Sequence, residues 1–395
     1  MTRSLDPVRR ATRRKVCVVI TARPSYSRIQ TALRAINAHP DLELQLVLGA
    51  SALLDRYGAI SHTVVQDGFD VAARVYMIVE GENVTTMAKT TGLGMVELAT
   101  VFDNLRPDVV VTIADRFETL ATAAAASYMN IPVAHIQGGE VTGSIDEKVR
   151  HAVTKLSNLH FVSTTKAAER VTRMGECPQT VFVTGCPSID LAAEACKDPD
   201  VAFDPFEKYG GVGDVFDPHG AYLVVMQHPV TTEYELAKQH VGETLMAIQD
   251  LQMPTFWFWP NVDAGSDGTS KGIRMFRERH QPRHVHFFKN MSPHDFLRLF
   301  NRSAVIVGNS SVAIREGSFL GVPAVNIGTR QEGRERGPNV VDVGYHTLEI
   351  RNAIERQLRN GRFAGTDLYG DGKAGPRIAE LLAHTALGVE KTLAY

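Results

Sequence analysis

The chain has 395 residues, a length at which one hydrophobic core usually gives way to two. Its formal net charge is only -2, and its basic residues are dispersed apart from a cluster in residues 1–15, which excludes the charge pattern of a nucleic-acid-binding protein. No apolar run is long enough to cross a membrane or to form a signal-peptide core, so we expect a cytoplasmic protein. The 4 cysteines have neither the number nor the spacing of a disulfide framework or a zinc site.

Short apolar runs alternate with helical patterns along the first half of the chain. Continuous apolar runs of this length predict buried strands, and the alternation predicts a parallel sheet with helices on both faces. The expected strands are Val16 to Ile20, Leu44 to Leu48, Val109 to Ile113, Val133 to Ile136 and His160 to Val162, with a helix over Thr119 to Met129.

A second series of strands follows a segment rich in Pro, Asp and Gly, which we interpret as a linker and hinge over Asp198 to Gly220. The predicted fold class is therefore α/β, with two doubly wound Rossmann-like domains, residues 1–197 and 198–377, that face a cleft at the carboxyl ends of their strands. The strands of the second series are Tyr222 to Met226, Thr255 to Trp259, His284 to Phe287, Ala304 to Val307 and Ala324 to Ile327.

Polar loops follow the strands of the first domain. Arg23 and Ser27 come after the first strand, where a helix begins, and we expect them at the cleft. Asp115 stands at the tip of the third strand, and two interpretations stay open: a carboxylate with a tuned pKa, or the N-cap of the next helix.

The loop from His135 to Glu147 adds two further acids, Glu140 and Asp146, around paired glycines that let the backbone approach a ligand closely. Together with Asp115 they place three carboxylates at one cleft. Proton transfer at an unactivated sugar carbon needs such groups as base and acid. The alternative is that Glu140 is a loop hydrogen-bonding group and Asp146 a helix cap.

The stretch from Gly308 to Gly317 is typical of a pocket for the diphosphate and ribose of a nucleotide. Ser310 and Ser311 are placed where a helix begins, so that free N–H groups and hydroxyls face a phosphate. Glu316 is placed to accept hydrogen bonds from a ribose, and Arg330 to bind the phosphates. The alternative is an ordinary capped helix beside a solvated loop. His228 follows a strand and is expected at the cleft rather than simply packed before Pro229.

With these motifs, the chain resembles the hydrolysing UDP-N-acetylglucosamine 2-epimerases, both the bacterial sialic-acid type and the epimerase domain of the bifunctional animal epimerase/kinase. The resemblance covers nearly the whole chain. The matching blocks begin at Asp115, Gly138, Arg150, Gly185, Gln227, Pro260, Gly308, Gly328 and Tyr369.

The resemblance implies a GT-B type architecture in which a C-terminal helix over 378–395 packs back on the first domain. It implies elimination of UDP to give a glycal, followed by hydration with inversion at carbon 2 to give N-acetylmannosamine. No metal or cofactor is required, the partner is the nucleotide sugar, and the assembly is a homodimer or homotetramer. The implied catalytic residues are Asp115, Glu140, Asp146 and His228; the implied binding residues are Arg23, Ser27, Arg116, His151, Asn261, Asp263, Ser310, Ser311, Glu316 and Arg330.

Three positions depart from the pattern of the relatives. Ala114 stands before the catalytic Asp where bacterial members usually have Gly, Ala52 replaces a histidine, and Ser25 replaces an acidic residue. All three concern the sugar half of the cleft. A UDP- or GDP-linked 2,4-diacetamido sugar therefore stays open as the substrate. So do a non-hydrolysing 2-epimerase and, in another class, a nucleotide-sugar-binding regulator or a transferase of the same fold.

Overall fold

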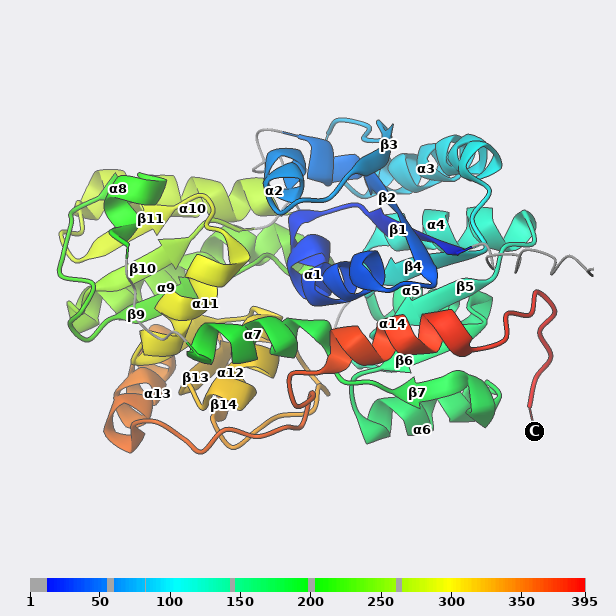
Figure 1. Ribbon diagram of the computed structural model, residues 1–395. Coiled ribbons are helices and arrows are strands. Elements are labelled where there is room, and N and C mark those ends of the chain that lie inside the picture. Colours follow the sequence, from blue (N-terminus) through cyan, green and yellow to red (C-terminus); the bar gives the residue numbers. More distant parts are fainter. Residues whose placement is uncertain are drawn as a thin grey trace, which may run out of the picture.

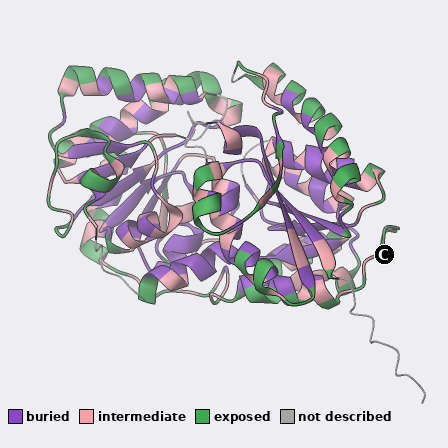
Figure 2. Cartoon of the chain, turned by 45° about the horizontal axis from the view of Figure 1, so that its top comes forward, coloured by how far each residue is buried: buried purple, intermediate pink, exposed green. Residues whose placement is uncertain are grey.

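The computed structural model describes residues 13–54, 60–81, 83–142, 146–197, 203–260 and 265–394. In these ranges the chain forms two seven-stranded sheets, and helices cover both faces of each (Figure 1). Strands and the inner faces of the helices are buried, while the outer helical faces are exposed (Figure 2). The predicted fold class, two doubly wound Rossmann-like domains, is confirmed.

The first sheet has the strand order β3-β2-β1-β4-β5-β6-β7, and every pairing in it is parallel. The order reverses at β1 and β4, so the loops after these two strands diverge and leave a crevice between them. The strands are β1 (Arg14–Ile20), β2 (Leu42–Gly49), β3 (Val71–Val75), β4 (Val109–Ile113), β5 (Val133–Ile136), β6 (Leu159–Val162) and β7 (Val181–Val183). The helices are α1 (Arg23–Ala38), α2 (Ile60–Gln66), α3 (Val84–Leu105), α4 (Phe117–Tyr128), α5 (Asp146–Leu156), α6 (Thr165–Arg173) and α7 (Pro187–Lys197).

The second sheet has the order β14-β13-β12-β9-β10-β11-β8, parallel except for the edge strand β8. Its strands are β8 (Val212–Gly213), β9 (Leu223–Met226), β10 (Thr255–Phe258), β11 (Val285–Phe288), β12 (Val305–Gly308), β13 (Ala324–Ile327) and β14 (Val340–Val343). Its helices are α8 (Pro205–Tyr209), α9 (Ala237–Leu251), α10 (Ser266–His280), α11 (Pro293–Arg302), α12 (Arg315–Leu320) and α13 (Thr347–Asn360).

The segment that we interpreted as a linker contains α8 and β8. Phe206 and Phe216 from this segment pack on the core of the second sheet, and β8 pairs with β11. The prediction of a linker is wrong for this part of the segment, because its Pro, Asp and Gly residues shape turns between aromatic side chains that bury apolar area against the sheet.

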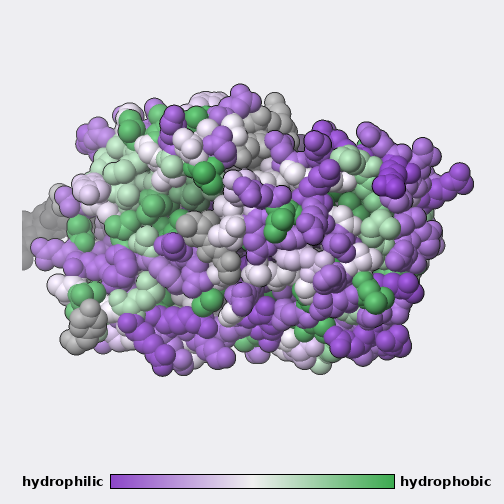
Figure 3. Space-filling view, turned by 180° about the vertical axis from the view of Figure 1, so that it is seen from behind, coloured by the Kyte–Doolittle hydropathy of each residue, from purple (hydrophilic) through white to green (hydrophobic). Residues whose placement is uncertain are grey.

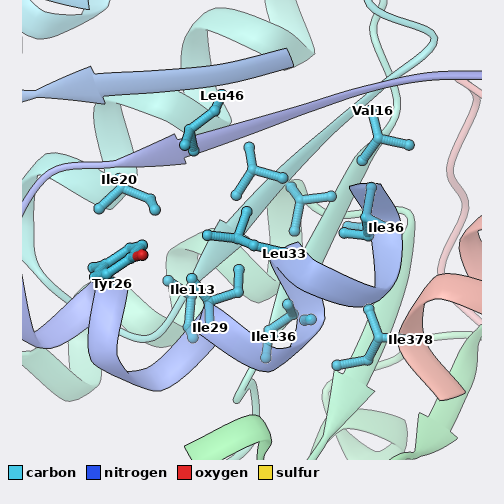
Figure 4. Close-up of a cluster of buried hydrophobic side chains, with 14 of the residues drawn as sticks. Val16, Ile20, Tyr26, Ile29, Leu33, Ile36, Leu46, Ile113, Ile136 and Ile378 are labelled. Atoms are coloured by element: carbon cyan, nitrogen blue, oxygen red, sulfur yellow. The ribbon is translucent and has the colours of Figure 1, made fainter. Parts of the chain in front are cut away.

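Helix α1 covers the centre of the first sheet. Its side chains at helical spacing, Tyr26, Ile29, Leu33 and Ile36, pack on the strands beneath (Figure 4). Helix α14 (Ala374–His384), from the far end of the chain, lies along α1 and adds Ile378 to the same cluster (Figures 1 and 4). The helix expected over 378–395 thus starts four residues earlier and ends at residue 384.

Helix α7 packs between the two sheets. It contacts α1 and α14 on one side and α11 and α12 on the other, and it buries Leu191, Ala192 and Ala195 in the core of the second sheet (Figure 1). Helix α7 thus joins helices that cover the first sheet to the core of the second sheet. In the described residues, no helix has the length and apolar character needed to cross a membrane.

Candidate active site

Two pockets that share lining residues lie between the sheets, with volumes of about 140 and about 20 Å³. The polar residues of the larger pocket include the predicted Arg23, Ser27, His228, Ser310, Ser311, Glu316 and Arg330. The smaller pocket is lined by Arg28, Asp115, Thr142, Asp146, Ser311, Arg330, Gln331 and Arg334. The structure therefore separates the predicted nucleotide residues from two of the predicted acids, and the two sets meet at Arg28, Ser311 and Arg330.

Asp115 faces the cleft and does not cap a helix. The N-cap of α4 is Arg116, with no capping side chain, so the interpretation of Asp115 as the N-cap of this helix is wrong. One carboxylate oxygen accepts a hydrogen bond from the guanidinium of Arg150, and the other lies 4.0 Å from Arg28 Nη1. Arg150 also donates to the backbone oxygen of Glu140 at 2.6 Å. A buried arginine on α5 thus holds the Asp115 carboxylate and the loop of the second acid together.

Glu140 is buried in a set of donors that come from both sheets. Its Oε1 accepts from Ser163 Oγ at 2.8 Å, and its Oε2 accepts from Arg334 and from Arg315 Nη1, the latter at 3.5 Å. Burial alone would raise the pKa of this carboxyl, but the charges of Arg334 and Arg315 outweigh it and lower the pKa. Glu140 is therefore an ionised carboxylate, held by arginines that reach it from the second sheet.

Positive charge exceeds negative charge at the two pockets. Five arginines and three carboxylates line them: Arg23, Arg28, Arg315, Arg330 and Arg334 against Asp115, Asp146 and Glu316. Burial, followed by repulsion from Arg315 and Arg334, lowers the pKa of Arg28 to about 9. Arg28 and Arg315 both donate to Ser311 Oγ, at 3.3 and 2.9 Å. An anion at this point would relieve the repulsion, so the site suits a diphosphate.

The loop after β12 supplies the serines of the predicted phosphate site. Gly308 has φ +128, and a Cβ there would lie 2.1 Å from the Met226 carbonyl, so this turn requires glycine. Ser310 caps a short 3-10 helix, η5 (Ser311–Ala313), and α12 begins only at Arg315, so the single helix predicted to start at the serines is split. The amide of Asn309 bonds the His228 backbone at 2.7 and 2.8 Å, which joins this loop to the loop after β9.

The larger pocket also has an apolar wall. Its wall comes from α11 and the strand ends beside it and includes Met226, Phe258, Met291, Phe296 and Leu297. A flat apolar group such as a nucleobase suits these side chains, next to the cationic end that suits phosphate.

Some predicted site residues are placed elsewhere. Arg116 Nε lies 3.2 Å from the buried carboxylate of Glu118, and His151 Nε2 lies 3.3 Å from Glu147 on the outer part of α5. In the described part of the chain, neither residue lines either pocket. His228 lines the larger pocket and not the pocket of the acids. The predicted Asn261 and Asp263 lie outside the described residues.

Sequence reasoning missed the arginines that organise the site. Arg150, Arg315 and Arg334 each stand four residues after a predicted cleft residue, namely Asp146, Ser311 and Arg330. Side chains four apart share a helical face, so this spacing was an available signal for the first two, which lie in helices or helical turns. Arg28, one turn into α1 from the predicted loop, carried a similar signal.

Comparison with known proteins places the chain in a family. The family model of UDP-N-acetylglucosamine 2-epimerase matches residues 34–383. The chain is 31% identical to the "UDP-N,N'-diacetylbacillosamine 2-epimerase (hydrolyzing)" of Legionella pneumophila, over 93% of this chain and 95% of that protein. It is 29% identical to the UDP-N-acetylglucosamine 2-epimerase of Neisseria meningitidis, over 94% of this chain and 95% of that one.

A solved structure agrees on the fold. The crystal structure of the Neisseria meningitidis UDP-GlcNAc 2-epimerase bound to UDP-GlcNAc has a TM-score of 0.76 to this chain at 19% identity, and covers 93% of this chain and 99% of that one.

Proposed function

Because this chain belongs to the UDP-N-acetylglucosamine 2-epimerase family, we propose that it is a hydrolysing 2-epimerase that converts UDP-N-acetylglucosamine and water to UDP and N-acetylmannosamine. One observation carries the proposal: Asp115 and Asp146 line a small pocket that joins a larger one through Arg28, Ser311 and Arg330. In this proposal the sugar lies at the acids of the smaller pocket, which has to widen from about 20 Å³ to admit a hexose ring. The diphosphate lies at the shared residues, and the base lies against the apolar wall.

The first step is an elimination. A carboxylate takes the proton from carbon 2 while the bond between carbon 1 and the diphosphate oxygen breaks, which leaves a carbon–carbon double bond and UDP. No carbonyl activates this proton, so the departing diphosphate has to be stabilised as the C–H bond breaks. Arg28, Arg330 and the Ser311 hydroxyl at the start of η5 supply that stabilisation.

The second step is hydration of the glycal. Water oxygen adds at carbon 1, and a proton is delivered to carbon 2 from the face opposite to the one that lost it. Asp115 and Asp146 are the acids that line the pocket, so they are the groups that exchange protons with the sugar or the water. Glu140, whose oxygens bond Ser163, Arg315 and Arg334, serves as a fixed negative charge that orders this arginine cluster.

Two specific observations favour a second substrate. The Legionella relative named above is described as acting on UDP-N,N'-diacetylbacillosamine, and the Ala52, Ala114 and Ser25 departures concern the sugar half of the cleft. The same elimination and hydration on a UDP-linked 2,4-diacetamido sugar is therefore the alternative function.

Assembly as a homodimer or homotetramer belongs to the same proposal. Hydrophobic residues gather on the side of the first sheet where α3 and α4 lie (Figure 3), and the exposed side chains of α3 include Val84, Leu93 and Val96. Such a face is typical of a surface that a second copy covers. Light scattering tests it: a monomer in the unsubstituted protein would contradict the proposal, and Val96→Glu should lower the mass of an oligomer.

The experiment that tests the reaction is incubation with UDP-N-acetylglucosamine in deuterated water without added metal, followed by NMR. We expect free UDP together with N-acetylmannosamine that carries deuterium at carbon 2. An epimeric nucleotide sugar without free UDP would indicate a non-hydrolysing enzyme. Release of UDP from a 2,4-diacetamido sugar but not from UDP-N-acetylglucosamine would select the alternative substrate. Absence of UDP and of deuterium uptake with both sugars would refute the proposed function.

A further inference from the structure

Ala114, the residue before Asp115, has an unusual backbone conformation. Its φ of +64° lies in the left-handed region, which a residue with a Cβ adopts less readily than glycine. Both of its backbone polar groups form hydrogen bonds with residues of β5. The N–H donates to the Ile136 carbonyl at 2.9 Å, and the carbonyl accepts from His135 Nε2 at 2.8 Å. The residue that precedes Asp115 is therefore held at the peptide on each of its two sides.

His135 is enclosed, with no exposed surface. Because Nε2 donates to a carbonyl, Nδ1 of the neutral ring is an acceptor, and the Thr154 hydroxyl 3.2 Å away is its donor. Burial lowers the pKa of His135 to about 4, although its hydrogen bond to Ala114 acts in the opposite direction. A Cβ at residue 138 would lie 3.1 Å from both His135 Nδ1 and Thr154 Oγ1, so Gly138 leaves room for this pair. The ring is thus one neutral tautomer in one orientation.

Helix α5 joins this hydrogen bond to the Asp115 carboxylate. Thr154, which orients His135, lies one turn after Arg150, which donates to the carboxylate of Asp115. Asp115 is thus held at its side chain by Arg150 and at its preceding peptide by His135. His135 itself does not line either pocket in the part of the chain that the structure describes. Any effect of His135 on the reaction therefore depends on its hydrogen bond to Ala114.

We propose that His135 is a positioning residue, whose hydrogen bond to the Ala114 carbonyl holds the left-handed peptide that aims Asp115 at the substrate. The competing account is a histidine that only fills the core. The proposal rests on the proposed function in one respect, namely that Asp115 takes part in the reaction. It is specific to a chain with alanine at 114, because glycine adopts this conformation without the help of a hydrogen bond.

The test combines two substitutions at His135 with one at Ala114. The side-chain amide nitrogen of Gln reaches the position of Nε2, so His135→Gln retains the donor, whereas His135→Leu removes it. We expect His135→Leu to lower kcat about 100-fold with KM changed by less than about 3-fold, and His135→Gln to recover most of the loss. In the His135→Leu background, Ala114→Gly should raise kcat about tenfold, a larger effect than in the unsubstituted protein.

Thermal unfolding separates the failure of this inference from the failure of the proposed function. Ala114→Gly should raise the Tm of the His135→Leu protein by about 2 °C more than it raises that of the unsubstituted protein, whatever the substrate is. Equal effects of glycine in both backgrounds, on Tm and on kcat, would overturn the proposal and leave His135 as a core residue. If the unsubstituted protein turns over no nucleotide sugar, the proposed function fails and the difference in Tm alone decides the role of His135.

Discussion

Glu140 and Glu176 are both buried carboxylates surrounded by cations, in two different regions of the molecule. Glu176, in the loop after α6, lies 2.6 Å from Lys155 Nζ, 2.6 Å from Lys391 Nζ and 3.0 Å from His160 Nε2. Its pKa is lowered to about 2, since these bonds outweigh its burial. By charge and burial alone, the two clusters look alike.

Their surroundings differ. The arginines of Glu140 reach it from the second sheet, and one of them, Arg334, lines the pocket of the acids. The partners of Glu176 come from α5, β6 and the C-terminal tail, where Lys391 also bonds three carbonyls at the end of α5. A buried carboxylate with a shifted pKa therefore indicates a functional site only where it lies beside a cavity and its partners come from both sides of a cleft.

The largest expected effect is on turnover. Asp115→Asn and Glu140→Gln should each lower kcat about 10³-fold, because one removes a proton-transfer group and the other the charge that orders the arginines. Glu176→Gln is the matched control and should keep kcat within about 3-fold. The measurement is UDP release in a coupled assay. If Glu176→Gln lowered kcat as much as Glu140→Gln does, the proposed difference in role between the two carboxylates would be contradicted.

The second effect is on stability and its pH dependence. Glu176→Gln should lower the free energy of unfolding by about 2 kcal/mol at pH 7, because it leaves two lysines beside a neutral partner. Since folding lowers the pKa of Glu176 from 4.5 to about 2, its contribution to stability is present above pH 4.5 and is lost as pH falls from there toward about 2. Denaturant unfolding at several pH values should show this loss of stability in the unsubstituted protein. In Glu176→Gln, the free energy of unfolding should fall less steeply over the same pH range.

The third effect is on the binding of UDP. Arg28→Ala should weaken UDP binding about tenfold, because it removes a buried guanidinium at the junction of the two pockets. Arg34→Ala is the control from the same helix, since Arg34 pairs with Glu194 on the surface. Calorimetric titration at two salt concentrations measures both. Equal affinities for the two variants would contradict the placement of the diphosphate at Arg28.

The smallest expected effect is on the free energy of unfolding when an exposed ion pair, rather than a buried one, is removed. Arg351 and Glu355 form an i,i+4 pair on the surface of α13, with 2.9 Å between Nε and Oε1. Arg351→Ala should change the free energy of unfolding by no more than about 0.5 kcal/mol, because solvent screens the pair. A change as large as that of Glu176→Gln, measured under the same conditions, would mean that burial is not what separates these pairs.

The sequence identified the central strands of both sheets, because a parallel strand buried on both faces is a continuous apolar run. It did not identify the edge strands β3, β7, β8 and β14, which are short or partly exposed and so lack that pattern. Asp115 and Ser311 were placed at the cleft from sequence for a related reason: in a parallel sheet, the residue after a strand lies at the carboxyl edge.

Only the tertiary structure decided which partners these residues have. The contacts of Glu140 with Arg315 and Arg334 join positions far apart in the chain, and they depend on how the two halves of the chain pack together around α7. The hydrogen bond from His135 to the Ala114 carbonyl depends on the register between β4 and β5, and no local pattern encodes it. The sequence by itself determined the elements and the chemical groups at their ends, because both are local properties of a buried strand and its loop. The pairing of those groups follows from long-range packing and required the folded chain.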